Sequence, residues 1–105
     1  IFDCTEFNKE FRHIDVLNEI AFLSVDLDFY GNPGLSNHFY RSYLEAYGMK
    51  EDDNLRKMYS YYKCYRANIR AKVTAINSRE NKNEHTDQDI QKYLRLMEQY
   101  SGNFS

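Results

Sequence analysis

The most constraining stretch of this sequence is residues 20–27, where apolar side chains face almost every direction of a helix. The helical pattern around that stretch covers residues 15–29. A helix that is apolar all round is buried on most of its sides or packed between two layers. A domain of 105 residues seldom supplies enough partners to bury such a helix fully. We therefore expect further protein to pack around this one.

Few residues in the chain favour tight turns. It contains 4 glycines and 1 proline, too few for the many turns of an all-β sandwich or barrel. Hydrophobic residues make up 42% and charged residues 29%, which is ordinary for a globular protein, and 105 residues correspond to a single domain. The composition therefore predicts one mainly α domain over residues 1–105.

Capping residues mark both ends of the expected second helix. Asn32 can cap it with Pro33 at its first position, where the missing N–H is not needed. Gly48 stands where the left-handed residue that follows a helix belongs. The large apolar residues that we expect on its core face are Leu35, Phe39, Tyr43 (with Leu44) and Tyr47.

The third helix is expected to be the longest, and acidic residues around Asp52 open it. Its apolar residues recur at intervals of three or four, and they are Leu55, Met58, Tyr62, Tyr65, Ile69, Val73 and Ile76. Residues 78–85 are polar and aperiodic and predict a loop. Thr86 with Asp89 resembles the capping box of a fourth helix that stops near Gly102. Helices joined by short loops are expected to run roughly antiparallel.

The N-terminal segment has a different character. It opens with IFDC, which is typical of the end of a buried β-strand. It has no initiator Met, and we therefore expect a fragment of a longer protein. Residues 5–12 alternate polar and aromatic side chains without a clean period and predict a loop. We therefore divide the chain into a strand remnant and metal-loop segment (1–12), a helical core (13–77), and a loop with a C-terminal helix (78–105).

The charge balance opposes two classes of partner. The net charge is −2 and the isoelectric point about 5.9, so no basic field recruits nucleic acid or a membrane surface. No apolar run approaches the ~20 residues needed to cross a bilayer. Cys4 and Cys64 lie far apart and fit no metal spacing, which favours two reduced thiols in a cytoplasmic protein, with a disulfide as the alternative.

Basic residues of the third helix are the first candidate site. Lys63, Arg66 and Arg70 share one face through steps of three and four residues. Together with neighbouring tyrosines they could bind phosphates or stack on bases. The alternative is the solvated or ion-paired face of an amphipathic helix, opposite the acidic residues of the first helix, Glu19, Asp26 and Asp28. We favour that alternative, because most surface helices have a charged face.

Motifs that carry chemistry are few. The histidines, His13, His38 and His85, share no metal-ligand spacing, and the sequence has no Ser-His-Asp arrangement, phosphate-cradling glycine loop or CxxC. Asp3 ends the expected strand, and Glu6 follows three positions later. Hard oxygen ligands at a strand end can hold Mg²⁺ beside nucleotide phosphates, so Asp3 is a candidate metal ligand. A loop-capping aspartate is the alternative.

Residues 1–76 resemble the aminoglycoside phosphotransferase-like family, nearest to bacterial two-part proteins in which such a domain precedes a P-loop ATP-binding domain. The order and the spacing of the shared motifs both hold. These motifs are IFDCTEFN (1–8), FRHIDV (11–16), EIAFL (19–23), DLDF (26–29), NPGLSN (32–37), YLE (43–45), YKCYRA (62–67) and RAKV (70–73). The segment after Ser78 shows no such resemblance.

The resemblance implies a helical C-terminal subdomain of a protein-kinase-like fold. It places the family's magnesium-binding aspartate on Asp3, which would chelate the metal that bridges the ATP phosphates. It places a structural aspartate, at the start of a buried helix, on Asp15. The family's acceptor substrate would meet the second or third helix.

The same resemblance implies that this chain alone has no kinase activity. The glycine-rich loop and lysine of the small lobe, and the catalytic loop, are not among these 105 residues. Phosphoryl transfer depends on positioning and charge neutralisation by all of these parts together. Mg²⁺ and ATP are therefore expected cofactors of the complete parent protein only.

Two functions follow as expectations. The leading one is a fragment of an ATP-dependent small-molecule kinase, whose partner is the missing N-terminal kinase lobe. The alternative is a non-catalytic helical interaction module, which forms a homodimer through exposed apolar surface. A weak magnesium site that is lost in Asp3→Asn favours the first, and a concentration-dependent dimer without metal binding favours the second.

Overall fold

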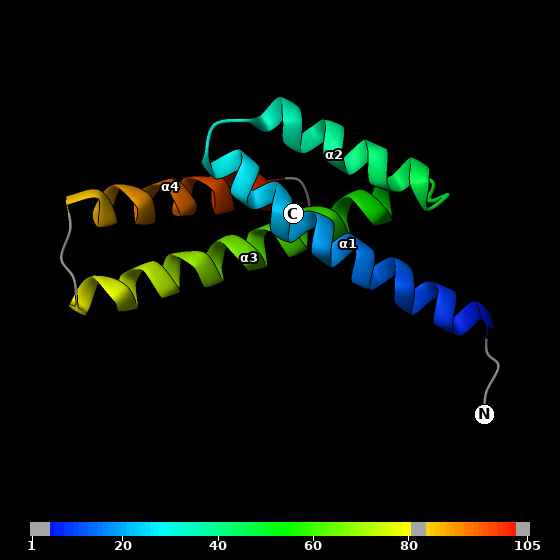
Figure 1. The fold of residues 1–105 in the computed structure, drawn as a ribbon, viewed down its shortest axis with the longest axis horizontal. Coiled ribbons are helices and arrows are strands. Elements are labelled where there is room, and N and C mark those ends of the chain that lie inside the picture. The colour runs from blue at the N-terminus through cyan, green and yellow to red at the C-terminus, as the bar shows by residue number, and fades with distance from the viewer. Residues whose placement is uncertain (1–4, 81–83, 103–105) are drawn as a thin grey trace.

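The computed structural model describes residues 5–80 and 84–102, and all regular structure in this part of the chain is α-helical (Figure 1). The helices are α1 (Thr5–Phe29), α2 (Pro33–Ala46), α3 (Asp53–Glu80) and α4 (Glu84–Ser101). The expected mainly α fold with about four helices is therefore confirmed. Residues 1–4, where the strand remnant is expected, lie outside the described part.

α1 is the central helix, because it packs against each of the other three. α3 and α4 lie side by side and antiparallel, and α2 returns along α1 in roughly the opposite direction (Figure 1). The molecule is elongated, with principal extents of 51 × 33 × 24 Å. This arrangement lets side chains from all the other helices meet on α1.

The core consists of two apolar clusters, and α1 contributes to both. The first contains Val16, Leu17, Ile20, Ala21, Tyr40, Leu44 and Tyr59. The second contains Val25, Phe29, Ala67, Ala71, Tyr93 and Tyr100. Stacked rings join the helices in each cluster, with centroids 3.9 Å apart for Tyr40 and Tyr59 and 4.3 Å apart for Phe29 and Tyr93. Such aromatic pairs contribute about 1 kcal/mol beyond the area that they bury.

The predicted helix ends around α2 and α3 are largely confirmed. Pro33 begins α2, although the side chain of Asn32 makes no capping hydrogen bond. Gly48 has a φ of +64°, the left-handed conformation expected after the end of α2. Asp52 caps α3, because its Oδ1 accepts a hydrogen bond from the Leu55 N–H at 2.7 Å.

Residues 5–12 belong to α1, so the prediction of a loop there is wrong. Phe7, Phe11 and Ile14 are spaced four and three residues apart, which is a helical spacing, and no glycine or proline interrupts the chain between them. The predicted boundary at residue 13 therefore falls inside one continuous helix. Asp15 likewise lies within α1. The resemblance implies that it stands at the start of a helix, so this expectation is not met.

The connection between α3 and α4 is shorter than the predicted loop over residues 78–85. α3 continues to Glu80 and α4 begins at Glu84. Thr86 therefore lies inside α4, and its predicted role as a helix cap is wrong. Polar residues continue a helix at little cost where their side chains reach solvent. The polar stretch therefore did not mark the end of α3 or the start of α4 correctly.

The buried faces of α2 and α3 agree only in part with the predicted apolar stripes. Of the predicted residues, Leu44 is buried, and several more pack half-buried against the first cluster, namely Phe39, Tyr43, Leu55 and Tyr62. The buried residues of α2 are Ser36, Tyr40 and Leu44. Those of α3 are Tyr59, Ser60, Ala67 and Ala71. Leu35, Tyr65 and Ile76, which belong to the predicted stripes, are more than half exposed. Small residues let neighbouring helices approach closely, whereas a hydropathy pattern gives most weight to large ones.

α1 is buried on one side only within the described chain. Ile20, Ala21 and Val25 are fully inaccessible, whereas Phe22 is 43% exposed and Leu23 is 46% exposed. The expectation that this helix is buried on most of its sides is therefore not met by the described helices alone. α2, α3 and α4 cover one side and leave an apolar outer face.

Candidate functional site

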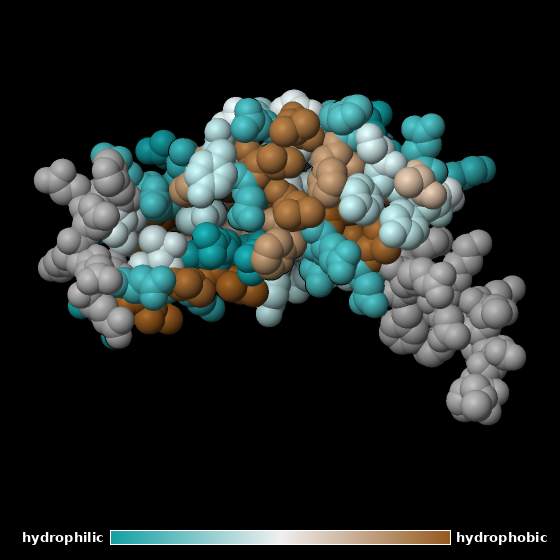
Figure 2. Space-filling view, viewed as in Figure 1, coloured by the Kyte–Doolittle hydropathy of each residue, from teal (hydrophilic) through white to brown (hydrophobic). Residues whose placement is uncertain are grey.

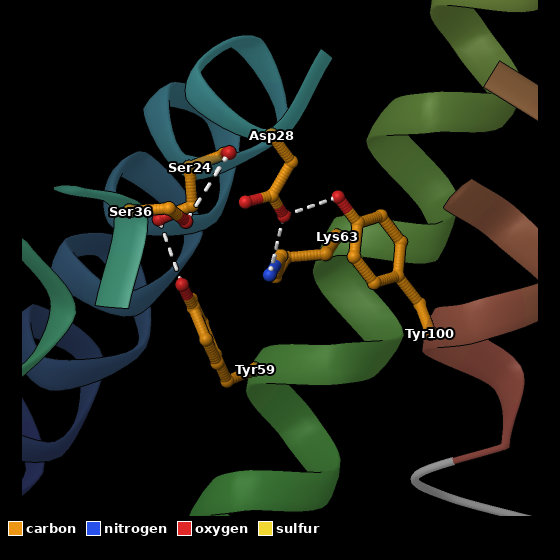
Figure 3. A network of polar contacts seen from close by, with 6 residues as sticks. All are labelled: Ser24, Asp28, Ser36, Tyr59, Lys63 and Tyr100. Carbon is orange, nitrogen blue, oxygen red and sulfur yellow. Dashed lines mark hydrogen bonds and ion pairs between the residues drawn. The ribbon is translucent and has the colours of Figure 1, made fainter. Parts of the chain in front are cut away.

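A buried ion pair links the end of α1 to the middle of α3 (Figure 3). Lys63 Nζ lies 2.9 Å from Asp28 Oδ2, and the two side chains are only 12% and 10% exposed. The hydroxyl of Tyr100, on α4, donates a hydrogen bond to the same carboxylate oxygen at 2.5 Å. One oxygen therefore joins three helices, and its partners compensate for the loss of water around a buried charge.

Two tyrosine rings flank the Lys63 ammonium. Its Nζ lies 4.4 Å from the ring centroid of Tyr100 and 4.9 Å from that of Tyr59. Cation–π attraction is stronger for a cation that is removed from water, so the rings replace part of the lost hydration. The ammonium is thus held by the Asp28 carboxylate and two rings, an arrangement that disfavours capture of an outside anion.

A second set of hydrogen bonds joins α1, α2 and α3 beside the ion pair. The Tyr59 hydroxyl donates to Ser24 Oγ at 2.7 Å, and Ser36 Oγ donates to the Ser24 carbonyl at 3.3 Å (Figure 3). Both serines are buried, and these hydrogen bonds satisfy their hydroxyl groups. We refer to Ser24, Asp28, Ser36, Tyr59, Lys63 and Tyr100 together as the polar network.

Both tyrosines of the polar network stay protonated at neutral pH. Burial, followed by the hydrogen bond to Asp28, raises the pKa of Tyr100 far above its ordinary value. Burial raises the pKa of Tyr59 to about 12, although hydrogen bonding with Ser24 opposes that shift. Each hydroxyl therefore serves as a hydrogen-bond donor and cannot act as a general base near pH 7.

The polar network forms one wall of a pocket of about 470 Å³. The remaining lining residues come from the α1–α2 turn, α2 and α4, and they are Gly31, Pro33, Asn37, Leu96 and Gln99. This volume suits a small molecule, and the exposed amides of Asn37 and Gln99 can hydrogen-bond to one. The carboxylate, ammonium and hydroxyls of the wall are engaged with one another, so the wall orients helices and holds no activated nucleophile.

The basic residues of α3 contact their own protein. Lys63 pairs with Asp28, so the predicted ion-paired face is confirmed at that position. The Arg66 guanidinium carbon lies 3.3 Å from the ring centroid of Phe22 on α1. Arg70 Nε donates to a tyrosine hydroxyl of α4 at 3.4 Å. The three side chains that share a face of α3 thus contact α1 and α4.

Asp3, the predicted metal ligand, lies outside the described residues. The backbone of Glu6 is part of α1, but its side chain is also outside the described part. Asp15 is exposed in α1. Among the described residues, no three His, Cys, Asp or Glu side chains are placed to hold a metal ion.

Cys64 and His38 are further sequence candidates within the described part of the chain. Cys64 has a free thiol whose Sγ lies 3.8 Å from a backbone carbonyl of α4, and burial raises the pKa of that thiol. Cys4 lies outside the described residues. His38 is exposed. None of the described helices is long and apolar enough to cross a membrane.

The sequence alone does not predict which residues form the polar network. Asp28 and Tyr100 are 72 residues apart, and Lys63 lies between them in sequence. The available signal is Asp28 itself, because a carboxylate at the end of an otherwise apolar segment needs a partner. Which cation and which hydroxyl meet it depends on how the helices cross, and periodicity does not specify that.

Comparison with known proteins finds relatives that are much longer. The chain is 36% identical over 84 residues to the uncharacterized proteins Rv2004c of Mycobacterium tuberculosis (strain H37Rv) and Mb2027c of Mycobacterium bovis. The match covers 80% of this chain, and the chain spans only 16% of the length of each of these relatives. No family model and no solved structure matches.

Proposed function

We propose that this chain is the helical part of a larger phosphotransferase-like protein with a protein-kinase-like fold, which transfers phosphate from ATP to a small molecule. The observation that carries the proposal is the length of the relatives. The match covers 80% of this chain but only 16% of each relative. In this proposal the chain is one segment of a long polypeptide and acts together with the rest of it. The motifs in residues 1–76 supply the chemical class.

The packing of the helices supports this role. α1 contacts all three other helices, as a central helix of a kinase-like larger lobe would. The polar network ties α1 to α2, α3 and α4 through Ser24 and Asp28. Phosphoryl transfer depends on accurate positioning, so a rigid helical body is a suitable support for the reacting groups.

The pocket beside the polar network supports the same proposal, because it offers a place where the acceptor substrate would bind. The resemblance implies that the acceptor meets the second or third helix, and Ser36 of α2 and Tyr59 of α3 both line this pocket. A small molecule with hydroxyl or amine groups would find the exposed amides of Asn37 and Gln99 there.

Mg²⁺ and ATP belong to the complete protein in this proposal. Asp3 would supply one magnesium ligand there, and the metal would neutralise charge on the phosphates. The base, the lysine and the nucleotide cleft would come from the kinase lobe outside these 105 residues. The chain alone is therefore proposed to be inactive.

An immunoblot of cells that make the protein tests the proposal. Antibodies against residues 84–102 should detect a polypeptide much heavier than the 12.6 kDa of this chain. A band at 12.6 kDa with no heavier species would contradict the proposal. The purified 105-residue chain, given Mg²⁺ and γ-labelled ATP, should release no labelled phosphate.

A further inference from the structure

The lining of the pocket beside the polar network carries no net charge. Its charged residues in the described part of the chain are Asp28 and Lys63, which neutralise each other at 2.9 Å. The other lining residues with polar side chains are neutral, and they are Ser36, Asn37, Tyr59, Gln99 and Tyr100. The volume of about 470 Å³ has room for a small molecule. The lining therefore favours a ligand that is polar but uncharged.

Some hydrogen-bonding groups of this lining are left for a ligand. The contacts of Lys63 and Tyr100 with Asp28 are both made to its Oδ2. Figure 3 shows the second carboxylate oxygen, Oδ1, pointing away from Tyr100. The exposed amides of Asn37 and Gln99 each offer both a donor and an acceptor. A hydroxyl group also donates and accepts, so a molecule with several hydroxyls would match this set.

A charged ligand would meet repulsion in the same place. A ligand cation at the Asp28 carboxylate would lie beside the Lys63 ammonium, which is already paired with it. A ligand anion at Lys63 would lie beside the carboxylate, and two tyrosine rings flank the ammonium. Removing either ion from water costs free energy, and the described lining has no unpaired opposite charge to offset it. Between a hydroxyl and a protonated amine, the pocket therefore favours the hydroxyl.

Apolar lining residues favour a ring over a wholly polar molecule. Pro33 of α2 and Leu96 of α4 line the pocket together with its polar groups. Sugars and cyclitols present C–H groups as well as hydroxyls. They can bury the C–H groups against apolar side chains while their hydroxyls keep hydrogen bonds.

The pocket is separate from the exposed apolar face of α1. Figure 2 shows apolar residues gathered over α1 in the middle of the molecule, flanked by hydrophilic ones. On α1, Phe22 and Leu23 are exposed by 43% and 46%, and they line a different depression with Asn18 and Glu19. None of these four residues lines the pocket beside the polar network. Other parts of a longer polypeptide can therefore cover this face and leave the pocket open.

We propose that the pocket binds a neutral polyhydroxyl ring compound, a sugar or a cyclitol, and discriminates against its amine and phosphate forms. Ligand hydroxyls donate to Asp28 Oδ1 and exchange hydrogen bonds with Asn37 and Gln99. The C–H groups of the ring lie against Pro33 and Leu96. That this compound is the phosphate acceptor rests on the proposed function, whereas its binding does not.

An NMR titration of the complete 105-residue chain, labelled with ¹⁵N, tests the ligand class. One set of probes is glucose, glucosamine and glucose 6-phosphate, and a second set is myo-inositol and its 1-phosphate. The neutral member of at least one set should bind with a Kd below about 10 mM, and roughly fivefold or more tighter than its charged forms. Absence of binding by both neutral probes would overturn the proposal. A charged form that binds as tightly as its neutral parent would also overturn it.

The same spectra locate the ligand. The side-chain amide signals of Asn37 and Gln99 should shift on binding, because these amides line the pocket. Asn77 and Gln91 are the controls, since both are exposed on α3 and α4 and neither lines the pocket. Shifts at Asn77 and Gln91 without shifts at Asn37 and Gln99 would contradict the assigned site.

Variants of Gln99 test the role of charge. Gln99→Ala should weaken binding of the neutral probe several-fold, whereas Gln91→Ala on the same helix should leave it unchanged. Gln99→Glu adds a carboxylate without a cation, so it should raise the affinity for glucosamine relative to glucose. Gln99 is exposed, so the circular dichroism of both variants should match that of the unaltered chain. Equal weakening by Gln99→Ala and Gln91→Ala would overturn the proposal.

Failure of this inference differs from failure of the proposed function. A complete protein that phosphorylates an acceptor whose KM is unchanged by Gln99→Ala would overturn the pocket as acceptor site and leave the phosphotransferase role standing. A complete protein that binds the neutral probe in a Gln99-dependent way but consumes no ATP would give the opposite result. The ligand class of the pocket would then hold, and the phosphotransferase role would be wrong.

Discussion

Replacing Lys63 with methionine should destabilise the fold strongly, because the Asp28 carboxylate would stay buried without its cation. The two side chains are 12% and 10% exposed, and their charged atoms lie 2.9 Å apart. Removing one member of a buried ion pair costs about 3–5 kcal/mol. Tyr100 would still donate to the same oxygen, so we expect the lower end of that range, about 3 kcal/mol.

The assay is urea unfolding followed by circular dichroism, with a thermal melt as a second measurement. An unfolding entropy of about 2.1 cal/mol/K per residue converts 3 kcal/mol into a fall of about 14 °C in Tm for 105 residues. The double variant Asp28→Asn/Lys63→Met should be more stable than Lys63→Met, because it leaves no unpaired charge inside the protein.

A matched control comes from an exposed ion pair. Arg56 lies 3.5 Å from Asp53, with side chains 57% and 86% exposed, so Arg56→Met should change the free energy of unfolding by less than about 0.5 kcal/mol. A loss below about 1 kcal/mol for Lys63→Met would refute the reasoning that the polar network holds the helices together. So would a double variant less stable than Lys63→Met.

Two further predictions concern stability. The folded pKa of Tyr59 is raised to about 12 and that of Tyr100 is raised further, so their contribution is complete below pH 10 and lost as the pH rises through 10 to 12. A urea midpoint as high at about pH 11 as at about pH 8 would contradict this. Asp52→Ala removes the acceptor for the Leu55 N–H and should lower the free energy of unfolding by about 1 kcal/mol. Asp52→Asn keeps an acceptor, so a urea midpoint equal to that of Asp52→Ala would argue against the cap.

Helix existence was predictable from sequence because local signals act over a few residues. Pro33 and Gly48 gave the ends of α2, and the apolar period placed α3. The alternation of polar and aromatic residues over 5–12 predicts a loop, whereas Phe7 and Phe11 are one four-residue helical step apart and lie in α1. That error came from the pattern chosen, since the helical spacing is present in the sequence.

The packing was not predictable, because it depends on helix crossings. Ser36 and Ala67 are buried where α2 and α3 approach α1, yet neither stands out in a hydropathy pattern. The same crossings bring Asp28, Lys63 and Tyr100 together across 72 residues. The sequence shows that the Asp28 carboxylate follows an apolar segment. Only the fold shows that Lys63 pairs with it and that Tyr100 donates a hydrogen bond to it.

Transfer of labelled γ-phosphate from ATP by the complete protein that contains this chain tests the central claim most directly. The account predicts Mg²⁺-dependent consumption of ATP that Asp3→Asn lowers roughly a hundredfold or more, because a ligand of the phosphate-bridging metal is lost. Asp87→Asn, an exposed carboxylate on α4, should leave the rate unchanged. Equal rates for Asp3→Asn and the unaltered protein, or no magnesium-dependent consumption at all, would contradict the account.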